Sequence, residues 1–139
     1  MISDERGQAL IESVLLGILL IVPVVWALMV LADVHRAALA ATAAAREAGF
    51  DAALSDDLVA ADARVDRAVE LALDNHGLDA RRSTVRWSAG EGLDRGARVE
   101  VHVAYPVSVV RFPFLGDVSG PSVWVRSTHI ARVDPFASR

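Results

Sequence analysis

Apolar residues are distributed unevenly along the chain, and the most apolar stretch lies near its amino terminus. Residues 9–32 hold 20 hydrophobic residues in 24 positions, and residues 13–32 contain no charged side chain. At about 1.5 Å per residue, twenty helical residues span roughly 30 Å, the thickness of the hydrocarbon core of a bilayer. The pattern therefore predicts a transmembrane helix. A buried core helix or a cleaved signal peptide fits less well, because both usually have shorter uncharged runs.

The residues that follow are rich in alanine and predict that the helix continues. Alanine has the highest helix propensity, and small side chains let helices approach closely. We therefore expect a packing face for the second helix or for a neighbouring subunit, and we assign Arg46 and Glu47 to the same packing segment. Gly49 is the expected end of the helix. Three alanines recur at a spacing of four, which places them on one helix face: Ala37, Ala41 and Ala45.

A second, amphipathic helix is predicted to begin at residues 55–57, where Ser55, Asp56 and Asp57 combine an N-cap with acids in the first turn. Gly77 is the expected residue after its end. The apolar positions recur at helical spacing and indicate a core-facing stripe: Leu58, Ala61, Val65, Ala68, Val69, Ala72 and Leu73. The charged positions are mostly on the opposite, solvent-exposed face: Asp57, Arg64, Asp66, Arg67, Glu70 and Asp74.

After Gly77 the spacing of apolar residues changes to two, which indicates β-strands. Strands are predicted at residues 84–88, 98–110 and 122–133, with a turn at residues 90–96. Pro106 is expected to break the second strand or to mark an edge. The chain is therefore assigned to the α+β class, with a long amino-terminal helix, a second helix and a roughly three-stranded antiparallel sheet. In the second strand the two faces alternate: Val99, Val101, Val103 and Tyr105 on one, Glu100, His102 and Ala104 on the other.

Composition and charge narrow the classes of function. The 139 residues include no cysteine, which excludes disulfides, thiolate metal sites and a cysteine nucleophile. The formal net charge is −4, and the 14 basic residues form no cluster along the sequence, so we expect no nucleic-acid-binding face. The sequence contains no glycine-rich phosphate loop, no nucleophile elbow and no paired-histidine zinc motif. We therefore expect a protein that is not an enzyme and takes no cofactor, metal or small-molecule substrate.

Two local features remain as candidate sites in the carboxyl-terminal part. His102 and His129 lie on predicted neighbouring strands with Glu100 nearby, so a metal site of two histidines and one carboxylate can be drawn. We favour ordinary surface or half-buried histidines, because no pattern places both side chains on one face. The second feature is an apolar loop that is a candidate partner contact, although folding back over the sheet is favoured: Phe112, Phe114 and Leu115.

Two segments of the amino-terminal third resemble the TadE-like family, whose members are minor pseudopilins of the Tad (Flp, tight-adherence) pilus system. A short polar leader and a glycine precede an apolar helix that carries a glutamate five positions after the glycine. An alanine-rich segment with an Arg-Glu pair follows the helix. The segments that carry the resemblance are Arg6-Gly7-Gln8-Ala9-Leu10-Ile11-Glu12 and Ala43-Ala44-Ala45-Arg46-Glu47-Ala48-Gly49.

The resemblance implies processing and membrane assembly. Cleavage is expected between Gly7 and Gln8 by a prepilin peptidase, an aspartyl membrane protease. Glu12 would then be the fifth residue of the mature chain, where it either pairs with a free amine on a neighbouring subunit or lies at the headgroup level. The expected partners are membrane lipid, other pilin or pseudopilin subunits and the pilus assembly machinery, which connects the chain to adhesion and secretion.

The expected organisation follows from the same resemblance. Residues 1–7 form a cytoplasmic leader, residues 8–49 the transmembrane and juxtamembrane helix, and residues 50–139 a small extracytoplasmic α+β domain. The chain would be a single-pass protein of a bacterial cell membrane, and it could also be incorporated in the pilus. Three alternatives stay open: an uncleaved membrane scaffold of a secretion machine, a secreted domain cleaved near Ala40, and a tethered metal- or ligand-binding module.

Overall fold

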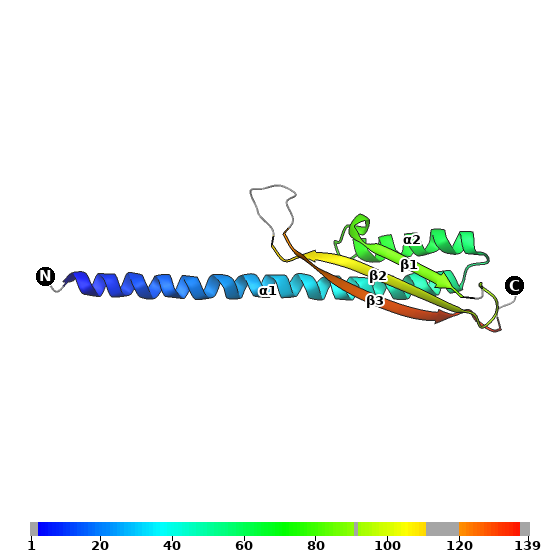
Figure 1. The fold of residues 1–139 in the computed structure, drawn as a ribbon, viewed down its shortest axis with the longest axis horizontal. Coiled ribbons are helices and arrows are strands. Elements are labelled where there is room, and N and C mark those ends of the chain that lie inside the picture. The colour runs from blue at the N-terminus through cyan, green and yellow to red at the C-terminus, as the bar shows by residue number, and fades with distance from the viewer. Residues whose placement is uncertain (1–2, 91, 111–119, 137–139) are drawn as a thin grey trace. The chain divides into compact units, whose positions relative to one another are not determined.

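The computed structural model describes residues 3–90, 92–110 and 120–136, and the side chains of the first helix from residue 8 onward. The elements confirm the α+β arrangement that the sequence predicts (Figure 1). They are α1 (Ser3–Ala53), α2 (Leu58–Asp74), the short 3-10 helix η1 (Ala80–Arg82), β1 (Thr84–Ala89), β2 (Arg98–Ser108) and β3 (Ser122–Arg132).

The chain divides into two compact units, Met1–Asp33 and Val34–Arg139. The described part of the first unit is the amino-terminal portion of α1, and the helix continues through Pro23. The second unit contains the rest of α1 with α2 and the sheet. Residues 34–49, which the sequence assigns to the membrane and juxtamembrane helix, therefore belong to the same compact unit as the α+β domain.

Helix α1 does not end at Gly49, as the sequence predicts, but at Ala53. Gly49 is buried in the second unit, and a Cβ atom there would lie 2.9 Å from Cδ2 of His129 on β3. That separation is shorter than ordinary van der Waals contact, so the absent side chain lets the helix and the strand approach closely. The expectation of a helix stop was wrong: Gly49 does not take the positive φ of a helix-ending glycine, and its missing side chain leaves room for His129.

Helix α2 begins within the predicted segment, with Asp57 as its N-cap, but its first turn contains no acidic residue, so the expected acids of the first turn lie before the helix. The Ser55 hydroxyl donates to the carbonyl of Asp51 in α1 and does not cap α2. The Asp57 carboxylate accepts a hydrogen bond of 2.7 Å from the backbone N–H of Ala60. Gly77 has a φ of 68°, and the N–H of Leu78 reaches back to the carbonyl of Leu73, as in a glycine-terminated helix. All of the predicted apolar stripe is buried except Leu58, which is exposed in the first turn.

The three strands form one antiparallel sheet in the order β1-β2-β3. Pairing of β1 with β2 runs from Thr84 opposite Ala104 to Ala89 opposite Val99. Strand β2 continues through Pro106, so the proline does not break it. Beyond Ala104 the strand pairs only with β3, and the missing N–H of Pro106 interrupts no pairing with β1.

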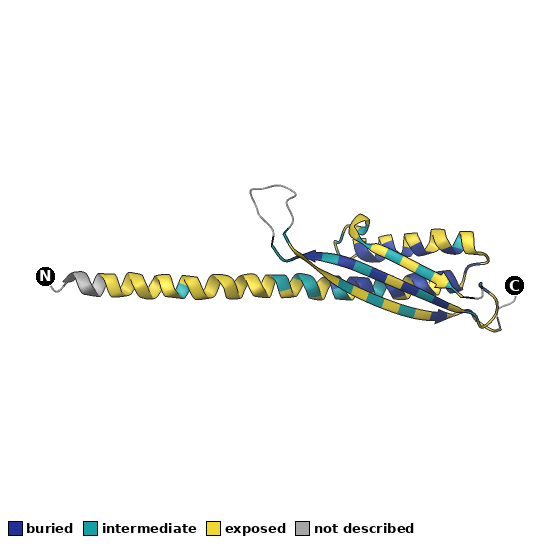
Figure 2. Ribbon diagram, in the orientation of Figure 1, coloured by how far each residue is buried: buried dark blue, intermediate teal, exposed yellow. Residues whose placement is uncertain are grey.

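The core of the second unit lies between the helices and the inner face of the sheet. Alternate residues of β2 are buried, and they join the apolar stripe of α2 and the alanines of α1 in one hydrophobic cluster (Figure 2). The even-numbered positions of β2 and β3 lie on the other, outer face of the sheet. The alternation predicted for β2 is confirmed: Val99, Val101, Val103 and Tyr105 are buried.

Candidate functional site

The first candidate site is the apolar portion of α1. Within the part of the chain that the structure describes, one helix is long and apolar enough to cross a membrane, and it lies near the amino terminus. From Leu10 to Leu31, sixteen large apolar side chains are 47–70% exposed, and they occur on all sides of the helix. A soluble helix buries at least one apolar face. This segment therefore presents a surface suited to lipid or to apolar helices of other subunits.

The residues that carry the processing prediction lie in the first turns of α1. Gly7 is within the helix, and Gln8 is exposed. Glu12 is also exposed, so its carboxylate is accessible to a partner group. Ser13, the next residue, donates a hydrogen bond of 2.8 Å to the carbonyl of Ala9 within the helix. The cleavage itself and the pairing of Glu12 stay predictions.

The alanine face of α1 lies inside the second unit. Ala37, Ala41 and Ala45 have no exposed surface, whereas Arg46 and Glu47 are exposed. The alanines therefore pack within this chain. A further five alanines of the same helix portion are also buried: Ala40, Ala44, Ala48, Ala52 and Ala53.

Arg46 is the first of three side chains in successive contact, and the third is on the sheet. Its guanidinium carbon lies 5.7 Å from the centre of the Phe50 ring, and the Phe50 ring centre lies 5.4 Å from that of His129. His129 in turn packs against Gly49. The contact between α1 and β3 is thus made by Gly49 and Phe50, with Arg46 against the Phe50 ring, while Glu47 is exposed.

The two histidines of the hypothetical metal site lie on opposite faces of the sheet. His102 is on the outer face, where its Nε2 lies 3.3 Å from Oε1 of Glu100 and its Nδ1 lies 2.8 Å from Oγ1 of Thr128. His129 is paired with Val101 in register and faces α1. No metal-binding group of three such side chains occurs among the described residues. The metal site that can be drawn from the sequence is therefore not assembled.

The predicted partner loop is not among the residues that the structure describes. Phe112, Phe114 and Leu115 lie outside the described residues, so their role as a partner contact stays a prediction.

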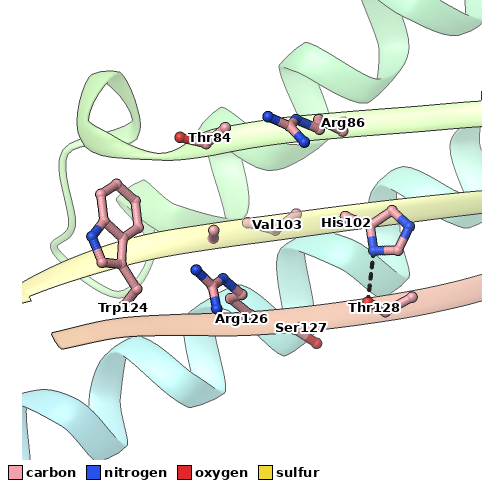
Figure 3. Close-up of a pocket in the computed structure, with 9 residues that line it drawn as sticks. Thr84, Arg86, His102, Val103, Trp124, Arg126, Ser127 and Thr128 are labelled. Carbon is pink, nitrogen blue, oxygen red and sulfur yellow. Dashed lines mark hydrogen bonds between the residues drawn. The ribbon is translucent and has the colours of Figure 1, made fainter.

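A cleft of about 520 Å³ lies on the outer face of the sheet (Figure 3). Its lining comes from all three strands, and Figure 3 shows the side chains of Arg86, Trp124 and Arg126 around it. No sequence pattern predicts this cleft. Its lining residues are Thr84, Arg86, His102, Val103, Ala104, Trp124, Arg126, Ser127 and Thr128.

The outer face of the sheet also gathers arginines that are far apart in the sequence. Strand pairing joins positions that the sequence separates, so these arginines cluster in space although they do not cluster along the sequence. The expected absence of nucleic-acid binding stays a prediction. Arg98 and Arg132 are direct partners across β2 and β3, and Arg86 is paired with His102. The arginines of this face are Arg86, Arg98, Arg126 and Arg132.

Comparison with known proteins identifies no relative of this chain. The chain matches no protein-family model, no curated protein and no solved structure.

Proposed function

We propose that this chain is a minor pseudopilin, or membrane-anchored component, of a Tad-type pilus assembly system. The apolar portion of α1 anchors it in a bacterial cell membrane and packs against helices of other subunits. The α+β domain contacts other subunits of the assembly outside the membrane. In this role the protein is a substrate of a prepilin peptidase, and it acts by binding other subunits and not by catalysis.

The observation that carries the proposal is a helix whose apolar portion is exposed all round and whose next portion packs in a folded domain. The apolar portion starts directly after Gly7-Gln8 and carries Glu12 at its entry. The carboxylate is accessible, and in the cleaved chain it would be the fifth residue. A positive amine on a neighbouring subunit would offset the cost of holding this charge at the edge of a membrane.

Processing is tested by the intact mass of the protein extracted from membranes of cells that also produce the prepilin peptidase. The expected mass is that of residues 8–139, and Gly7→Arg should yield the full-length mass in the same membrane fraction. Glu5→Arg is the matched control, because it adds an arginine to the leader but leaves Gly7 in place, and it should be processed. Full-length mass for the unaltered chain would instead support an uncleaved membrane scaffold and contradict the pseudopilin proposal.

The role of Glu12 is tested by assembly. Glu12→Ala should remove most of the protein from sheared surface fibres without changing its amount in the membrane, because the amine partner would lose its counter-charge. Glu12→Asp keeps the charge and should retain part of the assembly, and Ser13→Ala should have no effect. Normal fibre content of Glu12→Ala would show that Glu12 does no more than lie at the membrane surface.

A further inference from the structure

The cleft on the outer face exists because a small residue lies at its centre. Ala104 is in the middle strand, opposite Thr84 of β1 and Arg126 of β3. The positions around it carry long or wide side chains, namely Arg86, Arg126 and Trp124 (Figure 3). A methyl group surrounded by such side chains leaves a depression whose walls are two guanidinium groups and an indole. Arginine and tryptophan are enriched where proteins bind other proteins.

The positive charge of this face is not neutralised within the described part of the chain. None of its four arginines has an ion-pair partner among the described residues. The carboxylate on the face, Glu100, lies against His102 and not against an arginine. Four arginines and one glutamate leave the outer face positive, although the whole chain carries a formal net charge of −4. Negative charge is therefore concentrated elsewhere on the same molecule.

Much of that negative charge lies along one side of α2. Four exposed acidic residues, which we call the acidic stripe, recur every four positions: Asp62, Asp66, Glu70 and Asp74. A spacing of four keeps successive side chains on neighbouring positions of one helix side, about 6 Å apart. The stripe is therefore about 18 Å long. On the outer face of the sheet, Arg126 and Arg132 are six residues apart along β3, or about 20 Å.

The two surfaces cannot meet within one molecule. Helix α2 packs in the core on the inner face of the sheet, and Asp62 accepts a hydrogen bond of 2.8 Å from Nε1 of Trp87, an inner-face residue of β1. The arginines lie on the opposite face. An ion-pair contact between the arginines and the acidic stripe therefore requires two molecules.

We infer that the outer face of the sheet binds the acidic stripe of α2 in a second copy of this chain. The two surfaces are different, so the contact is head-to-tail and leaves one of each kind free for the next copy. Contacts of this type build rings or open filaments. The inference rests on the proposed function, because it names the head-domain contact of a subunit that assembles in a fibre.

Disulfide trapping in the full-length protein tests this contact, and the absence of cysteine makes the background low. One tagged copy carries Arg126→Cys, and a second copy with a different tag carries Asp66→Cys. Oxidation of membranes that hold both copies should give a mixed disulfide. The matched control replaces Asp66→Cys with Arg64→Cys, which points to a different side of α2. Equal yields from the two pairs would overturn the inference.

Charge exchange provides a second, independent measurement on the same trapped pair. Adding Arg86→Glu to the Arg126→Cys copy should lower the disulfide yield about tenfold, the size expected for reversing one close ion pair. Adding Glu70→Arg to the other copy should restore the yield. Arg81→Glu, an exposed substitution on η1, is the control and should have no effect. A loss that Glu70→Arg fails to restore would contradict the pairing of these two surfaces.

The measurements separate this inference from the proposed function. The intact mass of the same samples reports cleavage at Gly7 independently of the disulfide. Processed protein without the specific mixed disulfide would refute the contact and leave the pseudopilin proposal standing. Unprocessed protein that forms the mixed disulfide would refute the pseudopilin proposal and leave the contact between copies standing. If the disulfide is absent but inorganic phosphate binds to the protein and Arg86→Glu abolishes that binding, the cleft is an anion site and the second-copy inference is wrong.

Discussion

From Leu10 to Leu31 of α1, sixteen large apolar residues are 47–70% exposed, whereas from Ala37 to Ala52 the alanines of the inward face have no exposed surface. Both portions belong to one helix. Moving the exposed portion from water into lipid or protein contributes on the order of 20 kcal/mol. That exceeds the 5–15 kcal/mol that typically separates folded from unfolded protein. Large apolar side chains on every side of residues 10–31 indicate an apolar environment outside the chain. Alanines on one face of residues 37–52 indicate close packing within the chain.

The largest expected effect is a loss of membrane association when the apolar portion of α1 is altered. Leu19→Arg combined with Ile21→Arg should lower the amount of protein in the membrane fraction, because each arginine near the bilayer centre costs about 2.5–3.5 kcal/mol and the pair offsets a sizeable part of the gain from the apolar portion. The pair Val59→Arg and Leu71→Arg places two arginines at exposed apolar positions of α2 and should leave the distribution unchanged. Quantitative membrane flotation measures both. If the first pair floats as fully as the unaltered protein, this portion does not lie in lipid.

The second effect concerns the alanine portion. Ala45→Leu forces a larger side chain into the core and should lower the free energy of unfolding of the domain by about 1–3 kcal/mol. Ala27→Leu makes the same change in the exposed portion, and the domain should melt as before. Thermal unfolding in detergent, followed by circular dichroism, compares the two. Equal melting temperatures would mean that the alanine face is not packed.

A smaller effect distinguishes Gly49 from Gly17 of the same helix. Gly49→Val should lower the free energy of unfolding by about 1–2 kcal/mol, because the added atoms meet His129. His129→Ala should recover part of this loss when combined with it. A Cβ atom at Gly17 would meet no neighbouring group within 4 Å, so Gly17→Val should leave domain melting unchanged. If both valine variants melt alike, the contact between Gly49 and His129 does not stabilise the domain.

The smallest expected effect is on the free energy of unfolding when the N-cap of α2 is removed. Asp57→Ala removes the side chain that caps the helix and should cost about 1 kcal/mol. Asp56→Ala removes an equal charge one residue earlier and should have almost no effect. Urea unfolding of the two variants measures the difference. The comparison shows that the second unit has stability determinants that do not involve the apolar portion.

Local patterns were sufficient to predict most of the fold. The apolar stripe of α2, its caps at Asp57 and Gly77, and the alternation in β2 each depend on residues close together in the sequence. Gly49 was misread because a glycine that ends a helix and a glycine that permits close packing look the same in a sequence. Leu58 was misread because helical spacing does not show where the covering elements end.

The cleft could not be predicted in the same way. Alternation indicates that Arg86 and Arg126 occupy outward positions, but their proximity depends on the register that places both strands beside Ala104. These residues are about forty positions apart, and no local pattern fixes such a register. The processing site differs again: Gly7, Gln8 and Glu12 were recognised by their motif, and their function stays a prediction that the fold does not test.

The most direct test of the contrast within α1 is the environment of one residue from each portion. Single cysteines at Leu20 and Glu47 of the otherwise cysteine-free chain accept nitroxide spin labels, and the full-length protein is reconstituted in lipid vesicles. Electron paramagnetic resonance then compares accessibility to oxygen, which dissolves in lipid, with accessibility to a water-soluble nickel complex. We expect the label at residue 20 to be reached by oxygen and not by nickel, and the label at residue 47 to be reached by nickel. Nickel access at both positions would contradict the account.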